Sequence, residues 1–191
     1  MKKLLLFVFI ASSLSTFGQI REKGDIELSP FIGYSSSFLN GDDADSDNVR
    51  NAVNFGVVGD YFFNDRWSLR SGVVYNAMGA DDGDELALNY LSIPINANWH
   101  FGSTRKWNLN FGLSPGFLVK ADFNGNDIKD AVESFQLGIS YGIGYKLEIS
   151  EKFSLLFDAQ GLVGLTDIAK DSSFSNQNAG SSLNIGAVFK L

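Results

Sequence analysis

The sequence lacks several features on which common protein functions depend. It contains no cysteine, which excludes a disulfide framework, thiol chemistry and a lipid-attachment site at the predicted cleavage point. It contains one histidine, His100, although hydrolytic chemistry usually needs a base beside a nucleophile. No internal stretch reaches the roughly 18 apolar residues of a membrane-spanning helix. The formal net charge is −7 and Lys and Arg form no cluster, which argues against nucleic acid as a partner.

The one strongly apolar run stands at the start of the chain. Lys2 and Lys3 precede the apolar stretch 4–11, and a polar segment then ends in small residues at Gly18. This arrangement predicts a signal peptide over residues 1–18, cleaved between Gly18 and Gln19. A membrane anchor helix is the alternative, and it is disfavoured because the apolar run is too short. We therefore predict one exported domain over residues 19–191.

The chain is instead rich in long alternations of large and small side chains. Between residues 135 and 147 one phase is apolar and aromatic, while the other is mostly Gly and Ser. A period of two indicates a β-strand. A strand of roughly 13 residues exceeds the usual length of about 5–6, but it suits a tilted strand that crosses a bilayer, which needs roughly 9–11. Small side chains in the second phase are expected inside a narrow closed barrel.

The same alternation predicts eight strands. They cover residues 26–38, 53–63, 67–78, 87–101, 107–120, 135–147, 153–165 and the final stretch that ends at Leu191. Pro30 lacks a backbone donor, which suggests a bulge or a sheet edge in the first strand. The connections alternate between long (39–51, 79–86, 122–134, 166–179) and short (64–66, 102–106, 148–152). This regularity predicts an all-β fold, an eight-stranded antiparallel up-and-down transmembrane β-barrel, with the long loops outside the cell and both termini in the periplasm.

The aromatic residues support this interpretation, because membrane barrels carry aromatic girdles at both interfaces. The group beside the short turns and the C-terminus is Tyr61, Phe63, Trp67, Trp99, Phe101, Trp107, Tyr145, Phe153 and Phe189. The group expected near the opposite rim is Tyr34, Phe38, Tyr75, Tyr90, Phe117 and Phe135. A soluble barrel such as a lipocalin is the alternative, but it does not explain why the polar phase is so small and so poor in charge.

Three short motifs carry a resemblance to a known family. They are YLSIPI at 90–95, FGLSPG at 111–116, and a C-terminal spacing formed by Asn184, Gly186, Phe189 and Leu191. With its strand pattern, the chain resembles the PorT-like family of small outer-membrane β-barrels of the Bacteroidota, although Ser92 replaces the family's usual acid. The resemblance implies a Gram-negative outer membrane, contact with lipid and lipopolysaccharide, and recognition of the C-terminal residues by the barrel-assembly machinery.

Charged side chains in the small, inward phase form the first candidate site. They are Glu27, Asp60, Arg70, His100, Lys120, Lys146, Asp158 and Lys190. Unpaired charges inside a barrel would be costly, so we expect a buried ion-pair network that plugs the interior. A narrow, polar ion path is the alternative. A catalytic role for His100 is disfavoured because it lies beside a short turn, far from the outer rim.

The acidic loops are the second candidate. Asp43, Asp45 and Asp47 alternate in a way that suits oxygen ligation of Ca²⁺ or Mg²⁺, and residues 81–85 hold a similar cluster. However, the sixth and twelfth positions counted from Asp43 are Asn48 and Asn54, where a calcium loop needs Gly and Glu. We interpret these loops as solvated surface, with weak divalent binding as the alternative. No cofactor is expected.

These observations predict a non-enzymatic outer-membrane barrel with a filled interior. Its role would be structural in the envelope or mediated by its loops, through an envelope protein whose identity the sequence does not give. An accessory subunit of a secretion or transport machine is an alternative that follows from the resemblance alone. A narrow ion channel and a lipid-modifying enzyme are further alternatives.

Overall fold

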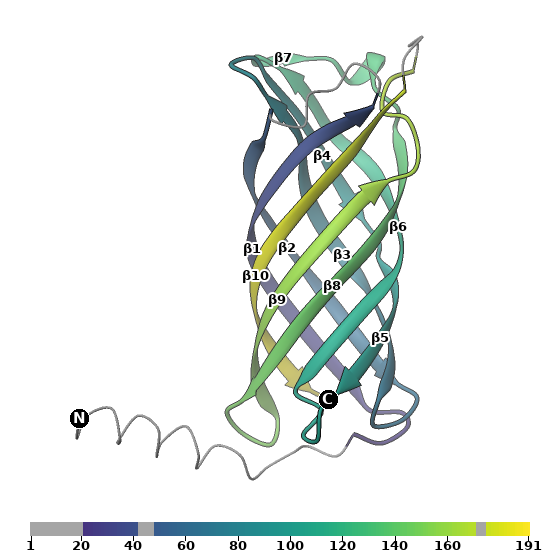
Figure 1. The fold of residues 1–191 in the computed structure, drawn as a ribbon, viewed down its shortest axis with the longest axis vertical. Helices are drawn as coiled ribbons and strands as arrows, with labels where there is room; N and C mark the ends of the chain where they lie inside the picture. The colour runs from purple at the N-terminus through teal and green to yellow at the C-terminus, as the bar shows by residue number, and fades with distance from the viewer. Residues whose placement is uncertain (1–20, 42–47, 171–174) are drawn as a thin grey trace, which may run out of the picture.

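The computed structural model describes residues 21–41, 48–170 and 175–191, and these form one sheet that closes on itself (Figure 1). The elements are β1 (Ile26–Gly41), β2 (Arg50–Phe62), β3 (Trp67–Asp81), β4 (Glu85–Ser92), β5 (Ile95–Phe101), β6 (Trp107–Phe123), β7 (Asn126–Asp127), η1 (Lys129–Ala131), β8 (Phe135–Glu148), β9 (Phe153–Gly164) and β10 (Asn176–Lys190). Neighbouring strands are antiparallel, and β1 closes the barrel by pairing with β10. No helix within the described ranges is long and apolar enough to cross a membrane.

Two of these elements are parts of one crossing strand. β4 and β5 flank Ile93 and Pro94, and the register with β6 is the same on both sides of them, since Ser92 pairs with Gly116 and Ile95 with Leu113. Pro94 interrupts the ladder because it has no backbone N–H. With the two-residue β7 set aside, eight strands cross the barrel in the described part of the chain. The predicted all-β, eight-stranded antiparallel up-and-down barrel is confirmed.

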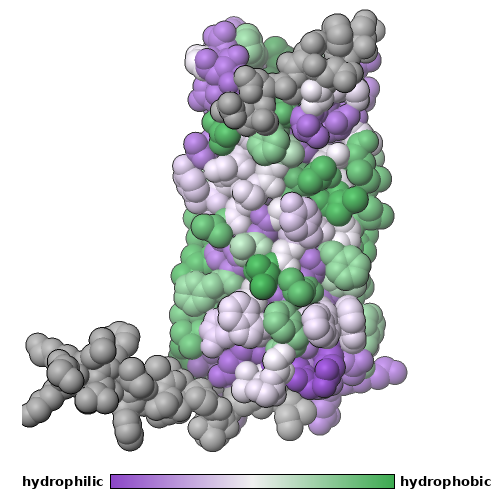
Figure 2. All heavy atoms as spheres, viewed as in Figure 1, coloured by the Kyte–Doolittle hydropathy of each residue, from purple (hydrophilic) through white to green (hydrophobic). Residues whose placement is uncertain are grey.

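The two side-chain phases lie on opposite sides of the wall. On β1, Ile32 and Tyr34 are exposed, whereas Glu27 and Ser29 are buried inside. The space-filling view shows apolar residues spread over the outer wall, with hydrophilic residues gathered at the two ends (Figure 2). We call the end where β1 begins and β10 finishes the terminal end, and the opposite end the loop end (Figure 1). An apolar outside and a polar inside are the reverse of a soluble barrel.

Aromatic side chains ring the outside at the terminal end. Trp67, Trp99, Phe101, Trp107 and Tyr145 follow one another across neighbouring strands, with successive ring centroids 6.3, 5.0, 6.3 and 4.8 Å apart. Toward the loop end, Phe55 stacks on Tyr75 at 4.9 Å, and Phe117 meets Phe135 at 5.6 Å. The expectation that Tyr90 belongs to the outer aromatic belt was wrong. Its neighbour Leu91 faces outward, so alternation turns Tyr90 into the barrel, where it is fully buried.

The strands extend further at the loop end than the alternation indicates. β10 begins at Asn176 inside the predicted loop 166–179, and β3 and β4 meet around a short turn in place of the predicted loop 79–86. Backbone ladder bonds continue where the bilayer no longer imposes an apolar outer face, so the hydrophobic pattern ends before the strand does. The predicted signal peptide (1–18), Asp43, Asp45 and Asp47 lie outside the described residues.

The irregularity expected at Pro30 is found in another strand. The register between β1 and β10 is unchanged across Pro30, and β1 is paired on both sides, so Pro30 makes neither a bulge nor an edge. A bulge lies in β6 instead. Asn89 pairs with Lys120 and Tyr90 with Leu118, which leaves Val119 as the extra residue. A bulge reverses the facing of the residues beyond it, and Lys120 therefore points outward.

Close approach of β2 and β3 generates a test of this packing. A Cβ atom on Gly72 would lie 2.1 Å from the carbonyl oxygen of Val57 and 2.6 Å from Cα of Val58, both parts of the β2 backbone. We expect Gly72→Ala to lower the free energy of unfolding by about 1–3 kcal/mol because β2 would have to move. Gly59→Ala is the matched control, since its Cβ would have no neighbour closer than 3.7 Å.

Urea unfolding in detergent micelles, followed by tryptophan fluorescence, measures both variants. Gly59→Ala should be neutral or slightly stabilising. Equal midpoints for the two variants would contradict the described spacing between β2 and β3.

Candidate functional site

The barrel interior holds three layers of side chains, and together they form the candidate site. Charged residues occupy the terminal end, amide and hydroxyl groups occupy the middle, and apolar residues close the loop end. Strand register produces the charged layer. It sets Glu27 of β1 opposite Asp60 of β2, and Asp60 opposite Arg70 of β3. Two adjacent buried carboxylates repel each other, so each needs its own cation.

Each carboxylate of this layer has a basic partner. Arg70 Nη2 lies 3.0 Å from Asp60 Oδ2, and Arg70 Nη1 lies 3.8 Å from Asp158 Oδ2. Lys146 Nζ bonds to Glu27 Oε2. The strands therefore bring together five of the charged residues that the sequence indicated, and we call them the charged network. The charged network is Glu27, Asp60, Arg70, Lys146 and Asp158.

Arg21 joins this network from outside the strands. Its Nε lies 2.6 Å from Glu27 Oε1, its Nη1 donates to the carbonyl oxygen of Arg105 at 3.2 Å, and its guanidinium lies 5.1 Å from the Phe62 ring centroid. The residue is only 2% exposed. Sequence analysis missed Arg21 because it precedes the first strand and belongs to no phase. Charge gave no signal in the sequence, because the predicted inward set held as many bases as acids or more; only with Lys120 and Lys190 placed elsewhere do the three acids and two bases of the charged network leave one negative charge uncompensated.

The other predicted charges lie elsewhere. Lys190 faces Glu27 across the ladder but forms its ion pair with Asp25 at the terminal rim, at 2.6 Å, with its side chain 28% exposed. The hydrogen bond from Lys190 lowers the pKa of Asp25. The expectation that Lys120 faces inward was wrong. The Val119 bulge turns it to the outer surface, where its side chain is 60% exposed and lies 3.6 Å from Asp122.

His100 belongs to the hydrogen-bond structure around Asp60. Ser68 Oγ donates to Asp60 Oδ1 at 2.8 Å and lies 3.0 Å from His100 Nε2. The hydroxyl has one proton and gives it to the carboxylate, so His100 must donate from Nε2. The order is therefore acid, hydroxyl, imidazole. A catalytic triad needs the imidazole between the other two groups, so this arrangement does not activate Ser68 as a nucleophile.

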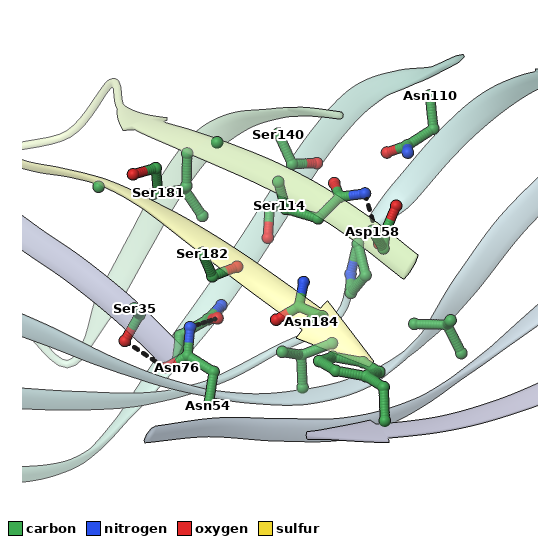
Figure 3. Close-up of a pocket in the computed structure, with 18 of the residues that line it drawn as sticks. Ser35, Asn54, Asn76, Asn110, Ser114, Ser140, Asp158, Ser181, Ser182 and Asn184 are labelled. Atoms are coloured by element: carbon green, nitrogen blue, oxygen red, sulfur yellow. Dashed lines mark hydrogen bonds between the residues drawn. The ribbon is translucent and has the colours of Figure 1, made fainter. Parts of the chain in front are cut away.

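A cavity lined by both polar and apolar side chains lies in the middle layer, with a volume of about 90 Å³ (Figure 3). Ser140 Oγ donates to Asn96 Oδ1 at 2.8 Å, and Asn96 Nδ2 donates to Asn110 Oδ1 at 2.9 Å. Asn110 Nδ2 and Asn184 Oδ1 have no hydrogen-bond partner among the described residues. Buried polar atoms of this kind are normally satisfied by water, and the cavity has the volume of roughly three water molecules. Arg70 and Asp158 of the charged network also line it.

An apolar cluster, the loop-end plug, closes the other end. Met78, Leu88, Tyr90, Leu118 and Ala121 come from the strands, and Val132 and Ile168 come from two loops. A bridge between Val132 and Ala169 joins these loops, and Glu133 N donates to the Ile168 carbonyl at 2.8 Å. Periodicity could not reveal Val132 and Ile168, because neither lies in a strand.

The described residues show no metal centre. Across 21–41, 48–170 and 175–191, no group of three or more acidic or histidine side chains is placed to hold a metal ion. The cavity lies between the charged network with Arg21 on one side and the loop-end plug on the other. This arrangement holds fixed charges and a cavity large enough for water inside the barrel.

An apolar outer wall, aromatic belts and a filled polar interior define an outer-membrane β-barrel. Residues 17–170 match the family described as "Outer membrane protein beta-barrel domain", and the chain belongs to this family. It is a protein of the Gram-negative outer membrane. No curated protein matches the sequence.

Solved structures of small outer-membrane barrels share the fold. OprG from Pseudomonas aeruginosa is 14% identical with a TM-score of 0.54, covering 91% of this chain and 98% of its own. Neisserial surface protein A is 11% identical with a TM-score of 0.54, covering 86% and 97%. Ail from Yersinia pestis, solved with the heparin analogue sucrose octasulfate, is 19% identical with a TM-score of 0.52, covering 86% and 99%. Identities this low show the fold alone.

The pairing in the charged network predicts unequal costs for two substitutions. Glu27→Gln would leave both Arg21 and Lys146 without their carboxylate, whereas Lys146→Met would leave Glu27 paired with Arg21. We expect each to destabilise the barrel, Glu27→Gln by about 3–5 kcal/mol and Lys146→Met by less. Lys190→Met is the matched control, and we expect it to cost less than about 1 kcal/mol because its ion pair is partly exposed.

Urea unfolding of the three variants measures these differences. Equal effects of Lys146→Met and Lys190→Met would show that the buried pair contributes no more than the pair at the rim.

Proposed function

We propose that this protein is a non-enzymatic outer-membrane barrel whose function resides on its surface, as an envelope component or through its loops. The observation that carries this proposal is the closure of the interior at both ends. The charged network and Arg21 fill the terminal end, and the loop-end plug fills the other. The acid, hydroxyl, imidazole order around His100 also supports a role without catalysis.

We place the loop end outside the cell and the terminal end in the periplasm, because an even number of strands keeps both termini on one side and outer-membrane barrels have short periplasmic turns and longer extracellular loops. The described loop end is acidic. Its acids are Asp81, Asp82, Asp84, Glu85, Asp122, Asp127, Asp130, Glu133 and Asp167, and its bases are Arg50, Lys120, Lys129 and Lys170. This charge disfavours a polyanion such as the one bound to Ail. It suits lipopolysaccharide only with bridging divalent cations, or else a cationic protein partner.

Membership of the PorT-like group and an origin in the Bacteroidota belong to the proposal, supported by the motifs at 90–95 and 111–116. So does recognition of Asn184, Gly186, Phe189 and Leu191 by the barrel-assembly machinery. Phe189 is exposed on the outer wall and packs 5.4 Å from Phe153, while Asn184 is buried inside. An assembly factor could read the outward residues before the barrel closes.

A narrow channel is the second candidate, favoured by the cavity in the middle layer, which is large enough for water. Because both ends of that cavity are filled, we expect the refolded protein to show no discrete conductance steps in a planar bilayer. A porin added to the same bilayer is the positive control, and protease protection of the reconstituted barrel verifies insertion. Uniform ohmic conductance steps from the wild-type protein would contradict the proposal of a closed barrel and support that of a narrow channel.

An accessory role in secretion or transport is tested by purification of the tagged protein from its own membrane in mild detergent. We expect recovery with lipid and lipopolysaccharide alone. Recovery of a protein partner in stoichiometric amount would contradict a stand-alone role and support the accessory role in an assembly with that partner.

A further inference from the structure

Three groups at the terminal end surround the guanidinium of Arg21, as they would surround a bound ligand. We propose that the mouth of the barrel at the terminal end is a guanidinium-binding site, filled by Arg21 of the same chain and able to accept a guanidinium from solution once the Arg21 side chain is removed. The site is defined by three groups: the carboxylate of Glu27, the carbonyl oxygen of Arg105 and the ring of Phe62.

The three groups match the chemistry of a guanidinium. Glu27 accepts from Nε at 2.6 Å while the Arg105 carbonyl accepts from Nη1 at 3.2 Å, so two edges of the planar group are used at once. The Phe62 ring, fully buried, lies 5.1 Å from the guanidinium carbon. Planar donors in a fixed fork and stacking on an aromatic face are properties of arginine. The ammonium of Lys146 also bonds to Glu27 and lies 5.6 Å from the Phe62 ring centroid, so a guanidinium is distinguished here by reaching the Glu27 carboxylate and the Arg105 carbonyl at once, which a compact point charge does poorly.

The acceptors are held in place without Arg21. Lys146, itself buried, bonds to the second carboxylate oxygen of Glu27 and fixes its orientation. Arg105 adopts a positive φ of 55°, a conformation uncommon for residues other than glycine. Its side chain bonds to Asp65 at 2.9 Å and to the carbonyl of Gly102, which stabilises the turn and directs its own carbonyl toward Arg21.

Charge balance gives the site its affinity. The charged network carries a net charge of −1 inside the barrel, and Arg21 brings the sum to zero. Without Arg21, one buried negative charge would lack compensation, which is costly in a region shielded from water. An empty site would therefore attract a cation that can also satisfy the Arg105 carbonyl.

The chain geometry permits Arg21 to be replaced. Gly24 N donates to the Phe62 carbonyl and Phe62 N donates to the Asp25 carbonyl, both at 2.9 Å, so the backbone is fixed from Gly24 onward. Arg21 lies before this anchor and outside every strand. Its side chain can leave without breaking the ladder between β1 and β2.

Chemical rescue tests the proposal. We expect Arg21→Ala to lower the urea midpoint of the full-length mature barrel in micelles. Millimolar methylguanidinium should restore that midpoint with a saturable dependence, whereas methylammonium at equal ionic strength should not. The wild-type protein should not respond, because Arg21 fills the site. Arg21→Ala combined with Glu27→Gln should not be rescued, because the carboxylate acceptor is gone.

Arg66→Ala is the control for loss of an arginine at the same end of the barrel, and we expect no rescue. If Arg21→Ala does not fold, the refolding yield with and without methylguanidinium replaces the midpoint as the readout. The same readout with a short peptide that contains one arginine, compared with the peptide in which lysine replaces it, shows whether the site accepts a polypeptide side chain. Rescue by the arginine peptide alone would indicate a side chain as a source of the guanidinium, and rescue by methylguanidinium alone would indicate a small free ion.

Equal rescue by methylammonium would overturn the proposal, because charge alone would then explain the effect. A response of the wild-type protein as large as that of Arg21→Ala would also overturn it, since the effect would arise elsewhere on the molecule. A wild-type midpoint in Arg21→Ala would show that the site contributes nothing.

Discussion

The structure depends on one constraint: the inside of a narrow barrel must be filled by half of the residues of its own strands, away from bulk water. Every charge placed there needs a partner within reach. The register between strands supplies these partners, since it sets Asp60 opposite Arg70 and brings Lys146 to Glu27. Small residues are the other half of this solution. Gly144 leaves space beside Asn108 and Asp158, whose side chain atoms would lie 2.8 Å from an added Cβ.

This constraint also explains why the two ends are closed by different means. At the terminal end the strands carry an unbalanced set of charges, and the segment before β1 contributes Arg21 to balance it. At the loop end the strands turn apolar side chains such as Leu88 and Leu118 inward, and two loops meet above them to add Val132 and Ile168. In both cases the residue that completes the closure comes from outside the strands. The cavity between the two closures is therefore lined by the strands, and segments that connect or precede the strands lie at its two ends.

Much of the fold could be predicted from the sequence because the two faces of a membrane barrel's wall meet different environments, lipid on the outside and crowded side chains on the inside. Lipid selects large apolar residues such as Ile139 and Tyr141, and the crowded interior selects Gly and Ser, so the phase of each strand could be predicted. Features that do not follow this alternation of side chains could not be predicted. The Val119 bulge reversed Lys120, and Tyr90 was assigned to the outer belt although its own strand turns it inward. Arg21, Val132 and Ile168 lie outside the strands, and only the assembled barrel shows where they go.

The same physics limits what likeness to other barrels can reveal. OprG and Neisserial surface protein A share the fold at 14% and 11% identity, because an eight-stranded barrel is specified by alternation of size and polarity more than by particular residues. Interior residues must fill space and pair charges, and lipid-facing residues must be apolar to contact the bilayer. Freedom to acquire a specific function is then concentrated at the two ends, where the acidic loop end and the Arg21 site lie. A specific function depends on particular sites and not on the shared barrel, so likeness of fold does not transfer it.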